Sequence, residues 1–151
     1  MKSRRMVSYA AVIMWMALIF MFSMQNGEDS SDMSGRLVAI LKFFGIGTEG
    51  QGLALISLFI RKAAHMAEYA ILFLLIANAV SIDFSGGKVY LYALLMTIGY
   101  AATDEFHQLF VPGRAGTPVD VVIDSIGAGF GSLIRVVSEA YGYKAKRNLK
   151  V

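Results

Sequence analysis

The feature that most constrains this chain is the apolar segment Met6–Met24, which contains no charged residue. A helix of about 20 apolar residues is long enough to cross the ~30 Å hydrocarbon core of a bilayer. Lys2, Arg4 and Arg5 precede the segment, and no cleavage site of small residues follows Phe22. We therefore interpret the segment as an uncleaved membrane anchor rather than a signal peptide.

The composition agrees with an integral membrane protein. The chain has 151 residues, of which 56% are hydrophobic and 17% are charged, and its mean hydropathy is +0.58. These values are too apolar for an ordinary soluble domain, and the length suits a single membrane domain over residues 1–151. The chain has no cysteine, which excludes disulfide and thiol chemistry and restricts metal ligands to His, Asp and Glu.

Three further apolar segments predict three more spanning helices. The first span is predicted at about 6–24, and the three further spans are predicted at 61–80, 89–110 and 119–137. Polar connections separate these three spans. The connection between 89–110 and 119–137 contains the turn-forming pair Pro112-Gly113. The predicted fold class is an all-α integral membrane protein, a bundle of four transmembrane helices.

The stretch between the first two spans predicts a helix on the membrane surface. Residues Met33–Phe44 mix apolar side chains with Arg36 and Lys42 at helical spacing. A later apolar run, Leu53–Val80, would be ~42 Å long as one helix, which exceeds the hydrocarbon core. We therefore expect an interfacial segment over about 33–60 and a second span that begins near residue 61.

The distribution of Lys and Arg predicts the orientation. With four spans both termini share one side, and that side holds nine of these residues: Lys2, Arg4, Arg5, Lys88, Arg135, Lys144, Lys146, Arg147 and Lys150. The other side holds five: Arg36, Lys42, Arg61, Lys62 and Arg114. Positive residues favour the cytoplasm, so both termini, including the basic tail 141–151, should be cytoplasmic. Basic residues at the two ends indicate membrane orientation rather than nucleic-acid binding.

Ionisable residues collect at one depth in this arrangement. Glu68, Asp104 and Asp124 should each lie ~9 to 11 Å from the outer end of their helix. Residues three, four and seven apart share one helical face, and three polar stripes follow: Arg61, His65 and Glu68; Asp104, His107 and Gln108; Asp120, Asp124, Gly127 and Gly131. Because polar groups facing lipid are costly, the stripes should face one another and form a pocket open to the outside.

Three neighbouring features bear on this pocket. Glu105 lies about 100° from Asp104 around the helix, so helical phase alone does not assign it to the pocket. Gly127, Gly129 and Gly131 form a small-residue face that would let another helix approach closely. The loop around Arg114 offers a guanidinium and backbone donors to an anion.

The same residues are compatible with binding, catalysis or a structural role. Arg61, Lys62 and Arg114 could simply pair with carboxylates and hold the helices in register. The set contains five carboxylates, three cations and two histidines: Glu68, Asp104, Glu105, Asp120, Asp124; Arg61, Lys62, Arg114; His65, His107. The excess of carboxylates favours protonated carboxyls or a bound cation, and hence a function.

Catalytic candidates are the pairs His65 with Glu68 and His107 with Asp104. Each pair has the helical spacing of a hydrogen-bonded acid–base pair or of two metal ligands. The spacing signatures of hydrolytic zinc sites are absent from the sequence, and the residues identify no particular metal or cofactor.

Three motifs in order resemble the VanZ-like family of bacterial membrane proteins: Arg61–Leu72, Asp104–Arg114 and Asp120–Gly127. The resemblance covers about residues 61–131, and we identify no family motif before Leu53. Asn is frequent in the family where this chain has Asp124. The family takes its name from a protein of glycopeptide-resistance clusters whose members are linked to teicoplanin resistance. The resemblance therefore implies a bacterial cytoplasmic membrane protein with an envelope role.

The leading hypothesis is an outward pocket that binds a lipid-linked or glycopeptide-type envelope molecule, with Arg61 and Arg114 on its anionic groups. The predicted pocket residues are Arg61, His65, Glu68, Asp104, Glu105, His107, Gln108, Arg114, Asp120 and Asp124. The alternative is an outer-leaflet enzyme that uses one of the two His–carboxylate pairs on a lipid-linked substrate. The lipid bilayer is a partner in either case.

Overall fold

The computed structural model describes residues 2–24, 35, 39, 51–114 and 116–148. These residues form four helices and no strand: α1 (Lys2–Ser23), α3 (Gln51–Val80), α4 (Gly87–Gln108) and α5 (Pro118–Asn148). The all-helical fold class is therefore confirmed for the described part of the chain. The predicted surface helix of residues 33–44 lies, apart from residues 35 and 39, outside it.

Three of the described helices are long and apolar enough to cross a membrane. They are Lys2–Ser23, Leu58–Val80 and Pro118–Gly142. Helix α4 has 22 residues and is long enough, but it is not among the segments that are also apolar enough. The fourth span therefore stays a prediction.

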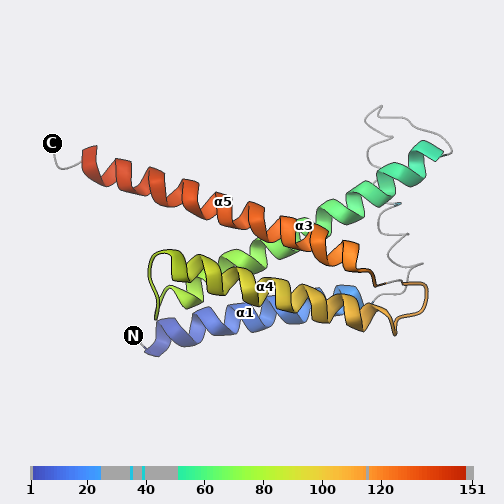
Figure 1. Cartoon of the computed structure of the whole chain (residues 1–151), viewed down its shortest axis with the longest axis horizontal. Coiled ribbons are helices and arrows are strands. Elements are labelled where there is room, and N and C mark those ends of the chain that lie inside the picture. Colours follow the sequence, from blue (N-terminus) through green and yellow to red (C-terminus); the bar gives the residue numbers. More distant parts are fainter. Residues whose placement is uncertain (1, 25–34, 36–38, 40–50, 115, 149–151) are drawn as a thin grey trace.

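The helices run back and forth, so that the bundle has two distinct ends (Figure 1). We call one the loop end, because it holds the α4–α5 connection, residues 109–117. The other is the terminal end, which holds the start of α1, the far end of α5 and the α3–α4 connection. Helices α1 and α4 lie side by side, while α3 and α5 cross each other.

Helix α3 is continuous over 30 residues. Residues 53–60 therefore continue the helix that contains the second predicted span, and their shallow position in the membrane stays a prediction. In Figure 1 the first turns of α3 extend past the neighbouring helices at the loop end. By length and hydropathy the spanning segment begins at Leu58, three residues before the predicted start at Arg61.

Two glycines set the crossing of α3 and α5. A Cβ atom at Gly127 would clash with the backbone of Met66, and one at Gly131 would clash with the backbone carbonyl of Ala70. Gly129 faces open space. The close approach expected of the glycine face thus occurs at Gly127 and Gly131, which are four residues apart and share one side of α5.

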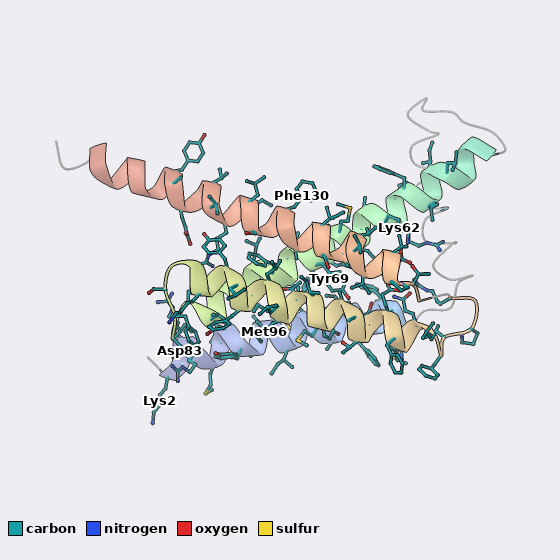
Figure 2. The ribbon with its side chains drawn as sticks, viewed as in Figure 1. Lys2, Lys62, Tyr69, Asp83, Met96 and Phe130 are labelled. Atoms are coloured by element: carbon teal, nitrogen blue, oxygen red, sulfur yellow. The ribbon has the colours of Figure 1, made fainter. Side chains whose placement is uncertain are left out.

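The core forms around the middle of α3, where Tyr69, Leu72 and Phe73 are fully buried. Two hydrogen bonds attach α1 to this core: the Trp15 indole donates to the Glu68 carbonyl at 3.0 Å, and the Tyr100 hydroxyl donates to the Met16 carbonyl at 2.6 Å. Large apolar side chains remain exposed on the outer surfaces, including Ile13, Leu91, Leu95, Val122, Ile126, Phe130 and Leu133. Figure 2 shows Tyr69 among the helices and Phe130 on the outer side of α5, as expected for a surface that contacts lipid.

Candidate functional site

A polar cavity of about 190 Å³ lies at the loop end, between α3, α4, α5 and the α4–α5 connection. It is lined by Leu58, Arg61, Lys62, His65, Glu105, Gln108, Gly113, Arg114, Asp120 and Asp124. All of the predicted pocket residues except Glu68, Asp104 and His107 are on this wall. The lining residues Leu58, Lys62 and Gly113 were not in the predicted set, although Lys62 directly follows Arg61 in the sequence.

An ion pair between Lys62 and Asp120 joins α3 to α5 at the cavity. Lys62 lies at the loop end of the bundle (Figure 2). The backbone N–H of Asp120 also donates to the Thr117 hydroxyl at 3.1 Å, so that Thr117 caps the start of α5. The pair therefore rests on a fixed first turn of the helix.

Glu105 forms part of the cavity wall through a contact with the α4–α5 connection. Its buried carboxylate accepts a hydrogen bond from the Thr117 N–H at 3.0 Å. A Cβ atom at Gly116 would clash with the Glu105 carbonyl, so only glycine allows the connection to return this close to α4. The α4–α5 connection folds back against Glu105, and this contact makes Glu105 part of the site. Helical phase does not predict such a contact.

Two carboxyl groups lie deeper in the bundle. Asp104 is 3% exposed and Asp124 is 1% exposed. The Gln108 amide donates to Oδ2 of Asp104 at 3.2 Å, whereas Oδ1 of Asp104 and Oδ2 of Asp124 have no hydrogen-bond partner among the described residues. A buried polar atom without a partner costs ~1–3 kcal/mol. Of these two carboxyls only Asp124 is on the cavity wall, so its Oδ2 is suited to accept a hydrogen bond from a bound molecule.

His65 and Glu68 lie one helical turn apart on α3. Nδ1 of His65 is 3.7 Å from Oε2 of Glu68, which is too long for a hydrogen bond but close enough for electrostatic interaction. His65 lines the cavity, whereas Glu68 does not. The backbone carbonyl of Glu68 accepts a hydrogen bond from Trp15 of α1.

His107 faces α1 rather than the cavity. Its ring centroid lies 4.5 Å from that of Phe20, with the ring planes at 44°. Asp104 and His107 lie one turn apart on α4, but His107 packs against Phe20 of α1. Among the described residues, no group of three or more His, Asp and Glu side chains is arranged to hold a metal ion.

Arg114 brings a second guanidinium to the cavity from the α4–α5 connection. It is half-buried and donates to the Phe22 carbonyl of α1 at 3.4 Å. Partial burial and the nearby charge of Arg61 lower the pKa of the Arg114 guanidinium, which remains charged at neutral pH. An anion placed near both arginines would relieve their mutual repulsion and accept hydrogen bonds from each.

The fold and this cavity define a class: helical membrane proteins with a polar cavity at one end of the bundle. Within that class, a family model described as VanZ/LLP1 matches residues 8–138, and the chain belongs to this family. The match extends the resemblance beyond residues 61–131 to include α1. It fits a membrane protein with an envelope role. No match was found among curated proteins or among solved structures.

Proposed function

We propose that this protein is a multi-pass protein of the bacterial cytoplasmic membrane, a single domain with α4 as its fourth span. Helix α4 lies beside α1, and its 22 residues would extend ~33 Å. Its most polar residues turn inward: Asp104, Glu105 and Gln108 are buried. With four spans, the excess of Lys and Arg at the terminal end places both termini in the cytoplasm.

A topology test can check this arrangement. We expect a green fluorescent protein fused after Ser85 to fluoresce, because this fusion ends in the cytoplasm. Alkaline phosphatase fused after Gly116 should be active, because it folds only outside. An active phosphatase after Ser85 would contradict the proposed orientation, and finding Ser85 and Gly116 on the same side would contradict α4 as a span.

The function that we propose for the polar cavity is to bind a lipid-linked or glycopeptide-type envelope molecule from the outer side of the membrane, with an effect such as teicoplanin resistance. The observation that carries this proposal is the combination of two neighbouring arginines with buried carboxyl oxygens that have no partner among the described residues. Arg61 and Arg114 would contact anionic groups of the ligand, and Asp124 would accept its hydrogen bonds. Family membership supports the envelope role.

Glu68→Gln tests whether the carboxylate beside His65 contributes to this function. We expect the variant to reach the membrane in normal amount but to leave cells as susceptible to teicoplanin as cells that lack the protein. The matched control is Glu139→Gln, because Glu139 is an exposed carboxylate at the terminal end. Full activity of Glu68→Gln would contradict this role, and its loss from the membrane would favour a structural role.

The second candidate function is an outer-leaflet enzyme. The observation that favours it is the approach of His65 Nδ1 to Glu68 Oε2 at the edge of the cavity, since such a pair can transfer protons. Turnover of a lipid-phosphate substrate by the purified protein would distinguish this role from binding alone.

A further inference from the structure

An apolar groove of about 300 Å³ lies on the outer side of the α4–α5 contact. Its lining includes Ala102, Glu105, Phe106, Leu109, Thr117 and Val121. Phe106 is 63% exposed and Leu109 is 57% exposed at its edge. If α4 and α5 both span the membrane, this groove opens directly to the hydrocarbon chains of the bilayer.

One residue is common to the walls of the apolar groove and the polar cavity. Glu105 lines both. Its hydrogen bond to the Thr117 N–H holds the α4–α5 connection against α4. A molecule that occupied both spaces would therefore pass beside Glu105, with a polar part in the cavity and an apolar part between α4 and α5.

The size of the polar cavity limits what it can accept. Its volume of about 190 Å³ is below the ~300–1,000 Å³ of pockets that enclose a drug-sized molecule. A complete glycopeptide therefore exceeds it, whereas a phosphate with a short polar extension does not. The additional 300 Å³ of the groove is apolar and suits part of a hydrocarbon chain.

The charges of the cavity define the headgroup further. Three cations face three carboxyl groups: Arg61, Lys62 and Arg114; Glu105, Asp120 and Asp124. A headgroup with only negative charge would meet as many carboxyl groups as cations. A phosphate that is followed by hydroxyl or ammonium donors can satisfy the arginines and also the Asp124 oxygen that has no partner among the described residues.

We propose that the ligand of this site is a membrane lipid whose phosphate lies beside Arg61 and Arg114, whose hydroxyl or ammonium donors reach Asp124, and whose hydrocarbon chain occupies the α4–α5 groove. The lipid reaches the cavity sideways from the bilayer, past Glu105. This inference rests on the proposed function of the cavity as a ligand site, and it selects a lipid over a water-soluble glycopeptide.

Photolabelling of the unmodified full-length protein tests the path of the chain. In vesicles that contain phosphatidylethanolamine with a photoreactive acyl chain, we expect labelling to concentrate on groove residues such as Phe106, Leu109 and Val121. An excess of unlabelled phosphatidylethanolamine should suppress it, whereas teicoplanin should not. Labelling spread evenly over the exposed apolar residues of all helices would overturn the proposal.

Lipid retention on the purified protein, measured by native mass spectrometry, tests the headgroup. We expect phosphatidylethanolamine or phosphatidylglycerol to be retained about tenfold better than phosphatidylcholine, which has a phosphate but no donor group. Equal retention of all three would overturn the role of the donors. Binding of phosphorylethanolamine as strongly as the whole lipid would overturn the role of the groove.

Two variants separate this inference from the proposed function. Ala102→Trp fills the groove and should reduce lipid retention about tenfold, whereas Met96→Trp, at an exposed position on the same helix outside the groove, should not. Arg114→Ala should also reduce lipid retention, because it removes a cavity side chain that contacts the lipid phosphate. If only Arg114→Ala reduces it, the cavity remains a ligand site but the groove proposal is wrong. If neither does, both proposals are wrong.

Discussion

Gly127→Ala is expected to destabilise the protein by ~1–3 kcal/mol, the usual cost of forcing an additional group into a close-packed contact. The new methyl group would overlap the backbone of Met66. A backbone cannot rotate away as a flexible side chain can, so α5 would have to move off α3. Gly131→Ala should act in the same direction through Ala70, and the double variant should fail to accumulate in the membrane.

Thermal unfolding in detergent, followed by circular dichroism and size exclusion, measures this effect. The matched control is Gly129→Ala, which adds the same methyl group to the same helix where nothing lies within 4 Å. Alanine favours a helix over glycine by up to ~1 kcal/mol, so the control should be neutral or stabilising. Equal destabilisation by Gly127→Ala and Gly129→Ala would show that the contact with Met66 is not the cause.

Asp104→Asn is expected to keep the fold and to weaken ligand binding. The carboxyl is buried, and Oδ2 accepts a hydrogen bond from Gln108 at 3.2 Å, which an asparagine oxygen can also accept. A neutral amide is less costly to bury than a carboxylate, so the thermal midpoint should stay the same or rise by a few degrees. Asp104 is not on the cavity wall, so the variant should act through Gln108, which lines the cavity. A neutral acceptor holds the Gln108 amide less firmly than a carboxylate does, so lipid retention should fall about threefold.

The control is Asp83→Asn, at an exposed position of the terminal end where Asp83 pairs with Arg5. An exposed pair of this kind contributes ~0–1 kcal/mol, so neither stability nor retention should change markedly. If Asp104→Asn prevents accumulation in the membrane, the carboxylates fasten the bundle. If it retains lipid normally, Asp104 does not position Gln108 for the ligand.

Much of the polar cavity could be predicted from periodicity. Arg61 and His65 on α3, Gln108 on α4, and Asp120 and Asp124 on α5 lie on its wall. Their shared position has a physical reason. A polar stripe that faces lipid is costly, so the polar stripes of neighbouring helices face one another. The close approach at Gly127 and Gly131 follows from the same spacing.

Helical phase placed His107 on the Asp104 stripe and left Glu105 unassigned, whereas the structure puts Glu105 on the cavity wall and His107 against α1. Both lie beside Asp104 on α4, and their surroundings depend on segments that are distant in the sequence. The α4–α5 connection returns to Glu105, while Phe20 of α1 covers His107. Periodicity describes one helix at a time. It does not show which other segment of the chain packs against each side of that helix.

The sequence by itself determined the helical class of the fold and the family, and it identified most of the residues of the polar cavity. These follow from local causes: a helix satisfies its own backbone hydrogen bonds, and apolar length limits what can cross a membrane. Only the tertiary structure decided that Glu105 lines both the cavity and an apolar groove, and that the carboxyls of Asp104 and Asp124 are almost completely buried. These features depend on how closely α3, α4 and α5 approach, which is set by side-chain contacts between residues far apart in the chain.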